Sequence, residues 1–79
     1  MTPTLEQVIS VVCSTGGLSA LDPDDDIFAK GFSSVAALQL LLELEAAFAV
    51  AIPDDAFMKR RTARGLAALV EALKGGHTA

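Results

Sequence analysis

The sequence predicts a small all-α domain, and three observations lead to this prediction. Two stretches repeat apolar residues at the i, i+3, i+4, i+7 spacing of an amphipathic helix. A central run, residues 35–52, contains neither Gly nor Pro. Capping residues precede these stretches and Gly or Pro follows them. With 79 residues, the chain has the size of one domain over 1–79, which we expect to hold three main helices and a short one.

The first helix is expected over residues 3–15. Thr2 can serve as its N-cap, and Pro3 suits the first helical position because that position needs no backbone N–H. Gly16 and Gly17 are typical of a helix end. Cys13 borders the core face and is interpreted as a small buried apolar residue, since a single cysteine cannot form an internal disulfide. The predicted core face consists of Leu5, Val8, Ile9 and Val12.

A long connection, residues 16–33, follows this helix. Four apolar residues spaced along it predict that it is ordered and anchored to the core: Leu18, Leu21, Ile27 and Phe28. Its acidic run 22–26 invites comparison with a calcium-binding EF-hand loop. The comparison fails, because the turn glycine would be Ile27 and the last acidic ligand would be Ser33. No other Cys, His or acidic cluster suggests metal ligands, so no metal site is predicted.

The second helix, predicted over 34–49, begins at two adjacent serines. If Ser33 is the N-cap, its side-chain oxygen accepts a hydrogen bond from a free amide of the first turn. Ser34 then occupies the first helical position with its hydroxyl facing outward. A phosphate ester at that position would be favoured by the unpaired N–H groups and partial positive charge of the helix N-terminus, by about 0.3–1 kcal/mol.

Projection of this helix at 100° per residue gives two apolar stripes. One has the spacing of a core-facing side: Ala37, Leu40, Leu41, Leu44 and Phe48. The other consists of Val35, Leu38 and Leu42, and Ser34 lies between the two. Since so short a chain is not expected to bury a helix on all sides, we interpret the second stripe as a docking surface for a partner. The alternatives are dimerisation through that stripe, or a few exposed leucines without a role.

Two further helices are predicted after Pro53, which ends the second helix region. A short one, 54–59, can be capped by Asp54 or Asp55, with Phe57 or Met58 turned inward. The last helix, 63–74, has Thr62 as a potential N-cap, and Gly75-Gly76 is expected to end it, leaving a flexible tail, 75–79. His77 lies in that tail and is a poor catalytic candidate. The core face of the last helix is predicted to be Leu66, Leu69, Val70 and Leu73.

Composition limits the classes of function. The net charge of −4 and isoelectric point near 4.6 argue against nucleic acid as a partner. No apolar segment is long enough to span a bilayer, so no membrane association is expected. Because the single cysteine cannot form an internal disulfide, the reducing cytoplasm is the expected location. No nucleophile with a nearby base, metal set or phosphate-binding glycine loop indicates an enzyme. The basic cluster Lys59, Arg60, Arg61 and Arg64 is either a solvated helix junction or a patch that contacts an acidic partner or a phosphate.

The chain resembles a known family in two runs. Residues 26–35 read Asp-Ile-Phe-Ala-Lys-Gly-Phe-Ser-Ser-Val, and residues 44–55 read Leu-Glu-Ala-Ala-Phe-Ala-Val-Ala-Ile-Pro-Asp-Asp. Both runs, in their relative spacing, are similar to the phosphopantetheine-dependent acyl and peptidyl carrier proteins. The resemblance covers nearly the whole chain and rests on Phe28, Gly31, Ser34, Val35, Phe48, Ile52 and Pro53. Most of that family has Asp where this chain has Ser33, and acids are common there at the positions of Ala36, Gln39 and Ala46.

The resemblance implies an acyl-carrier-like bundle and a discrete acyl carrier protein, a monomer without catalytic activity. Ser34 would carry 4′-phosphopantetheine covalently, and acyl or aminoacyl groups would be held as thioesters for fatty acid, polyketide or specialised lipid biosynthesis. Implied partners are a phosphopantetheinyl transferase, an acyl- or aminoacyl-activating ligase, and a downstream synthase or transferase. The implied docking residues are Ser33, Val35, Leu38, Leu42, Glu45, Phe57 and Met58.

Two alternatives to this interpretation stay open. The run from Ile52 to Thr62 is also similar to a subset of discrete bacterial carriers, some of which are loaded with amino acids by synthetase-like ligases. The chain would then be an aminoacyl or peptidyl carrier. The alternative from another class is a non-catalytic helical interaction domain in which Ser34 has no covalent role.

Overall fold

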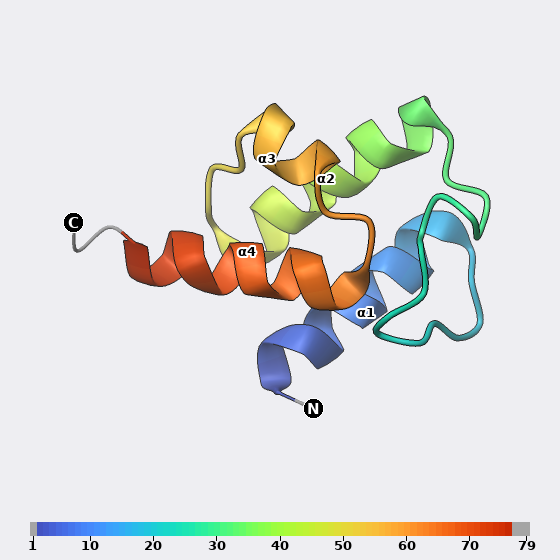
Figure 1. The fold of residues 1–79 in the computed structure, drawn as a ribbon, viewed down its shortest axis with the longest axis horizontal. Helices are drawn as coiled ribbons and strands as arrows, with labels where there is room; N and C mark the ends of the chain where they lie inside the picture. The colour runs from blue at the N-terminus through green and yellow to red at the C-terminus, as the bar shows by residue number, and fades with distance from the viewer. Residues whose placement is uncertain (1, 77–79) are drawn as a thin grey trace.

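The computed structural model describes residues 2–76 and confirms the predicted all-α fold. It contains α1 (Pro3–Gly16), α2 (Ser34–Phe48), α3 (Asp54–Met58) and α4 (Ala63–Gly76), and residues 2–76 include no β-strand (Figure 1). Helix α1 packs against both α2 and α4, and α3 lies against α4. No helix in this part of the chain is long and apolar enough to cross a bilayer. Each helix boundary lies within two residues of its predicted position, as far as such boundaries are defined.

The caps of α1 explain why the helix occupies this segment. The Thr2 hydroxyl oxygen accepts a hydrogen bond from the backbone N–H of Leu5, at 3.1 Å, and Pro3 is the first helical residue. At the other end, Gly17 adopts a left-handed conformation with φ of 67°, which glycine reaches without the steric penalty that other residues meet. Both predicted caps of α1 are thus confirmed.

The core contains most of the residues that helical periodicity placed there. Buried members of the predicted set are Leu5, Val8, Val12, Leu40, Leu41, Leu44, Ile52, Leu66, Leu69 and Val70. Four predicted core residues are only half-buried and pack at its margin: Ile9, Phe28, Phe48 and Leu73. Phe48 is near the end of α2, and its ring faces the Lys74 ammonium group at 5.8 Å from the centroid. This aromatic side chain therefore has one face on the core and one near a cation.

Phe32 is a core residue that the periodicity did not predict. Its side chain is buried, although it lies in the connection and not in a helix. The ring packs against Gly16, where an added Cβ would be only 2.5 Å from Phe32 Cε1. The close approach requires glycine at the end of α1. Phe32 thereby anchors the segment that leads directly into α2.

The connection between α1 and α2 is ordered, as predicted. Leu21 and Ile27 are buried, and Leu18 and Phe28 are half-buried against the core. Two backbone hydrogen bonds join the connection to the start of α4: Ile27 N–H donates to the Arg61 carbonyl oxygen at 2.8 Å, and Arg64 N–H donates to the Pro23 carbonyl oxygen at 3.0 Å. In Figure 1 the connection forms one end of the bundle.

The end of α4 differs from the prediction. Gly75 and Gly76 were expected to stop the helix, but α4 continues through both of them. A glycine inside a helix is less favourable than alanine by only about 1 kcal/mol, so it does not by itself end a helix. The predicted flexible tail, 75–79, is therefore wrong for its first two residues, and its remainder, with His77, lies outside the described residues.

Candidate functional site

The two adjacent serines at the start of α2 have different roles. Ser33 is the N-cap: its backbone is extended, and its hydroxyl oxygen accepts a hydrogen bond from the Ala36 N–H at 3.2 Å. Ser34 is the first residue of α2 and its side chain is exposed. The chain reaches this pair through Gly31, which has a φ of 105° that L-amino acids with a side chain rarely adopt. Both serine side chains are exposed, and the Ser33 hydroxyl is the one that caps the helix.

The environment of Ser34 suits a phosphate ester. The first amides of a helix have no acceptor within the helix, and Ser33 satisfies the one that belongs to Ala36. The remaining N–H groups of the first turn and the helix dipole favour an anion next to Ser34. A hollow of about 120 Å³ lies beside it between α2 and α3, lined by Ser34, Leu38, Leu41, Asp54, Phe57 and Met58.

The second apolar stripe of α2 is exposed, as predicted. The exposed fractions are 79% for Val35, 56% for Leu38 and 53% for Leu42. By contrast, Leu41 and Leu44 are buried in the core. Side chains this apolar and this exposed, on three neighbouring positions of one helix, form the kind of patch that proteins use for recognition. The helical projection therefore correctly separated the exposed leucines, Leu38 and Leu42, from the buried ones, Leu41 and Leu44.

The short helix α3 contributes one exposed and one buried side chain. Met58 is 51% exposed and extends the apolar surface beside Ser34. Phe57 is only 2% exposed, which corrects its assignment to an exposed docking surface. Its ring belongs to the core and lines the inner side of the hollow. In α3 the core receives Phe57 and Met58 is left facing solvent, because the larger aromatic side chain gains more from burial.

Glu45, another predicted docking residue, has a structural contact that the sequence did not reveal. Its side chain is half-buried, and Oε2 accepts a hydrogen bond from the Ile52 N–H at 2.9 Å. The contact closes the turn after α2, in which Ala49 adopts a left-handed conformation with φ of 54°. A carboxylate that caps a turn is less available to a partner than a solvated one. No sequence pattern indicates a contact between these two positions.

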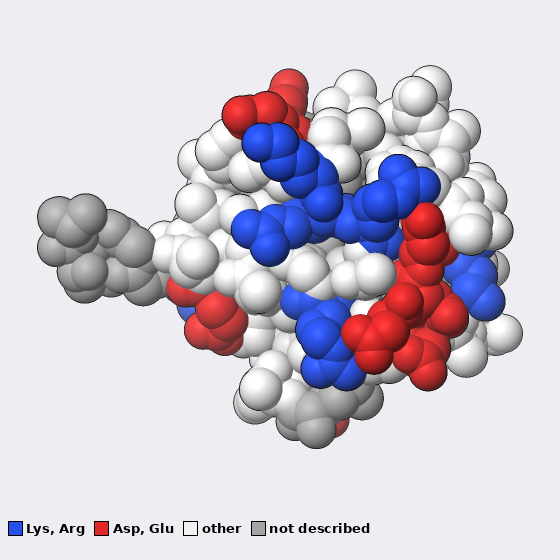
Figure 2. Space-filling model, viewed as in Figure 1, with Lys and Arg blue, Asp and Glu red and all other residues white. Residues whose placement is uncertain are grey.

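Two of the four residues of the basic cluster form ion pairs with aspartates of the connection between α1 and α2. Arg61 Nε lies 2.9 Å from Asp26 Oδ2, and Arg64 Nε lies 2.8 Å from Asp24 Oδ1. Figure 2 shows Lys and Arg side chains meeting a group of Asp and Glu side chains on one face of the molecule. The hydrogen bond from Arg61 lowers the pKa of Asp26, and the hydrogen bond from Arg64 lowers the pKa of Asp24. Arg61 and Arg64 thus bind the connection, and they form half of the predicted basic patch.

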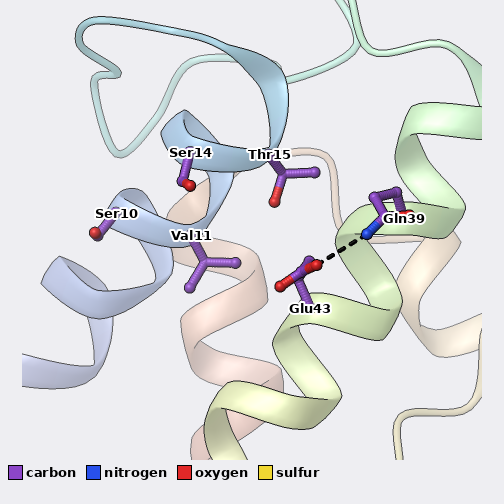
Figure 3. Close-up of a pocket in the computed structure, with 6 residues that line it drawn as sticks. All are labelled: Ser10, Val11, Ser14, Thr15, Gln39 and Glu43. Atoms are coloured by element: carbon purple, nitrogen blue, oxygen red, sulfur yellow. Dashed lines mark hydrogen bonds between the residues drawn. The ribbon is translucent and has the colours of Figure 1, made fainter.

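A larger hollow, of about 450 Å³, lies between α1 and α2 and does not include Ser34 (Figure 3). Its lining is mainly polar: Ser10, Val11, Ser14, Thr15, Gln39 and Glu43. The Gln39 amide donates to Glu43 Oε2 at 2.9 Å along the exposed side of α2. These α2 residues project away from the stripe that contains Leu38 and Leu42. None of the predicted site residues lines this hollow, so size alone does not locate the site.

A four-helix domain that exposes a serine at the start of its second helix, flanked by apolar side chains, has the layout of a carrier domain. The family model described as "phosphopantetheine attachment site" matches residues 6–70, and the chain belongs to this family. No curated protein and no solved structure matches the chain significantly.

Family membership defines the class of cofactor. Members carry 4′-phosphopantetheine covalently on a serine, and this chain is a phosphopantetheine-carrying carrier protein. Carrier domains of this family generally have no catalytic activity of their own and interact with a phosphopantetheinyl transferase and partner enzymes. The exposed hydroxyl and first-turn amides at Ser34 fit such a phosphate ester, as described above.

Proposed function

We propose that Ser34 is the attachment site and that the protein is a discrete acyl carrier protein. The observation that supports the proposal most directly is the division of the serine pair. Both side chains are exposed, but Ser33 Oγ accepts the capping hydrogen bond from the Ala36 N–H, whereas Ser34 is the first residue of α2. The phosphate formed on Ser34 would lie where the amides of the helix N-terminus favour negative charge.

The chain's part in the attachment reaction is to supply a nucleophile. Ser34 Oγ forms a new P–O bond to the phosphate that bears the pantetheine of coenzyme A, the pyrophosphate bond breaks, and the nucleotide portion of coenzyme A leaves. The hydroxyl proton passes to a base of the phosphopantetheinyl transferase. Once attached, the group supplies a terminal thiol that holds an acyl group as a thioester.

The proposed docking surface consists of Val35, Leu38, Leu42 and Met58. These four side chains are each more than half exposed and lie along the first nine residues of α2 and at the end of α3. Successive enzymes, among them an acyl-activating ligase and a downstream synthase or transferase, would bind this surface one at a time. An apolar patch of this size suits small, transient interfaces better than a permanent complex. We place the protein in the cytoplasm as a monomer.

The hollow beside Ser34 supports presentation of the cargo at the surface. Its volume of about 120 Å³ is below the roughly 300–1,000 Å³ of pockets that enclose a whole small-molecule ligand. The start of the arm or a small group would fit there, with the remainder of the arm outside. A short acyl group or an aminoacyl group is therefore favoured over a long acyl chain enclosed in the bundle, and aminoacyl carriage is the second candidate function.

The test is intact-protein mass after incubation with coenzyme A and a promiscuous phosphopantetheinyl transferase. The parent protein should gain the mass of one phosphopantetheine group. Ser34→Ala should gain none, whereas Ser33→Ala should still be modified, with helix capping weakened by about 1 kcal/mol. Modification of Ser34→Ala would contradict the assignment, and an unmodified parent would favour the non-catalytic interaction domain. Loading the modified protein with acyl and aminoacyl ligases in parallel would then separate the two kinds of carrier.

A further inference from the structure

Arg61 contacts the segment Asp26–Phe28 in several independent ways. Its guanidinium Nε donates to Asp26 Oδ2 at 2.9 Å. The guanidinium carbon lies 4.8 Å from the centroid of the Phe28 ring, in a cation–π arrangement. Its backbone carbonyl oxygen accepts a hydrogen bond from the Ile27 N–H at 2.8 Å. One residue at the junction of α3 and α4 thus contacts three successive residues of the connection.

Asp26 completes this arrangement through its second carboxylate oxygen. Oδ1 accepts a hydrogen bond from the Phe28 N–H at 2.9 Å, so the side chain joins Arg61 to the backbone of its own segment. The neighbouring residue of the junction, Thr62, forms a backbone bridge with Asp26. The Asp26 carboxylate is therefore held by hydrogen bonds to both of its oxygens, one from Arg61 and one from the Phe28 backbone.

The segment held by Arg61 leads directly to the serine pair. Three successive turns follow it, closed by hydrogen bonds from Ala29 N–H to the Asp26 carbonyl oxygen, from Lys30 N–H to that of Ile27, and from Gly31 N–H to that of Phe28. Each turn takes its acceptor from residues 26–28. Because the turns are consecutive, a displacement of residues 26–28 would be transmitted to the approach to Ser34.

We infer that Arg61 is a positioning residue for the modification of Ser34. Arg61 does not contact Ser34; it contacts Asp26 and Phe28 and thereby fixes the segment that leads to Ser34. The inference rests on the proposed attachment at Ser34. A transferase must bind the start of α2 together with the residues before it. If that segment is already fixed, little conformational entropy is lost on binding. Without Arg61, the segment would become ordered only when the transferase binds. The entropy lost in that step would weaken binding and raise KM.

The expected size of the effect follows from the exposure of the contacts. The side chains of Arg61 and Asp26 are 58% and 39% exposed, and ion pairs at such sites change equilibria by a factor of about 1.5 to 5. The attraction between them also weakens at high salt. Loss of Arg61 should therefore raise the transferase KM by about 2- to 5-fold at low ionic strength, with kcat little changed. At about 1 M salt the KM of the variant should lie closer to the KM of the parent.

The experiment compares Arg61→Gln with Arg64→Gln in the full chain, using coenzyme A and a phosphopantetheinyl transferase. Arg64 is the control: it forms an exposed ion pair with Asp24, earlier in the same connection, through hydrogen bonds from Nε at 2.8 Å and from Nη2 at 3.2 Å. Arg61→Gln should raise KM at low salt, Arg64→Gln should do so less, and Arg61→Lys should recover part of the loss by restoring the charge. Asp26→Asn, which keeps an oxygen for the Phe28 N–H, should reproduce the effect of Arg61→Gln.

Two readouts separate positioning from general stability. Helix content at the assay temperature should equal that of the parent in each variant. Amide hydrogen exchange should quicken over residues 26–34 in Arg61→Gln and Asp26→Asn but not in Arg64→Gln. Equal KM values for Arg61→Gln, Arg64→Gln and the parent would overturn the inference while leaving attachment at Ser34 intact. A parent that gains no mass, or gains it in Ser34→Ala, would overturn the proposed function and this inference together.

Discussion

The ring of Phe32 occupies the space that a side chain at Gly16 would need. An added Cβ at position 16 would lie 2.5 Å from Phe32 Cε1 and 2.6 Å from Cζ, well inside van der Waals contact. This contact joins the end of α1 to the residue that precedes the serine pair. The last residue of one helix and the entrance to the next are thus fixed against each other.

Gly16→Ala should consequently lower the free energy of unfolding. Overpacking typically costs about 1–3 kcal/mol, against which the better helix propensity of alanine returns at most about 1 kcal/mol. Phe32→Leu removes the outer ring atoms, so the cost of Gly16→Ala should shrink in the double variant. Chemical denaturation of the four proteins in this cycle gives the coupling energy. Additive single effects would show that the ring moves away without cost.

Leu41 and Leu42 are adjacent on α2 but face different environments. Leu41 is 5% exposed and Leu42 is 53% exposed, so Leu41→Ala should lower stability by about 2–5 kcal/mol through a cavity and lost burial. Leu42→Ala should change stability little, yet slow modification or loading if this face binds partners. A melting curve and a transferase rate for each variant provide the comparison. Equal destabilisation with unchanged rates would remove Leu42 from the docking surface.

Ala49 is a site at which a substitution should stabilise the protein. It ends α2 in the left-handed region with φ of 54°, where glycine avoids a steric penalty of about 1–2 kcal/mol. Ala49→Gly should raise the unfolding free energy by about 1 kcal/mol after allowance for the added flexibility of the unfolded chain. Ala51→Gly is the control, since Ala51 is also exposed but is outside the positive-φ region. It should be neutral or slightly destabilising.

The ion pairs of the connection should make the free energy of unfolding depend on pH in the acidic range. Hydrogen bonds from Arg64 and Arg61 hold the pKa values of Asp24 and Asp26 below the ordinary 3.8. The unfolded chain then binds more protons than the folded one in that region, so stability rises with pH. The contribution is complete above the ordinary value and is lost as the pH falls through the lowered values.

The variant Asp24→Asn/Asp26→Asn tests this dependence. Its melting temperature should lie below that of the parent at neutral pH, and the difference should narrow as the pH falls below 3.8. High salt at neutral pH should also narrow the difference, because it screens exposed pairs. A difference that is constant from neutral pH to strong acid would show that these ion pairs contribute nothing.

The features that sequence analysis predicted well are those set by local periodicity. The N-cap role of Ser33, the outward position of Ser34 and the separation of Leu41 from Leu42 all follow from spacing along one helix. The hydroxyl of an N-cap contacts an amide only three residues away, so a short stretch of sequence is enough to indicate it.

The features that it missed depend on contacts between distant segments or on elements too short to show a period. Asp26 meets Arg61 across the fold, and nothing in either segment indicates the other. Phe32 is buried because of the space beside Gly16, which only packing reveals. In the five-residue helix α3, Phe57 and Met58 span too little of a turn for periodicity to decide which one faces inward.

The hydrogen bond that Ser33 accepts also bears on the proposed choice of Ser34 as the attachment site. Two identical hydroxyls stand side by side, and their intrinsic reactivity is the same. Ser33 Oγ accepts a hydrogen bond from the Ala36 N–H, and a phosphate ester on it would place a bulky group at the cap of α2. A modifying enzyme that binds the start of α2 would therefore meet one serine whose oxygen caps the helix and a second serine at the first helical position.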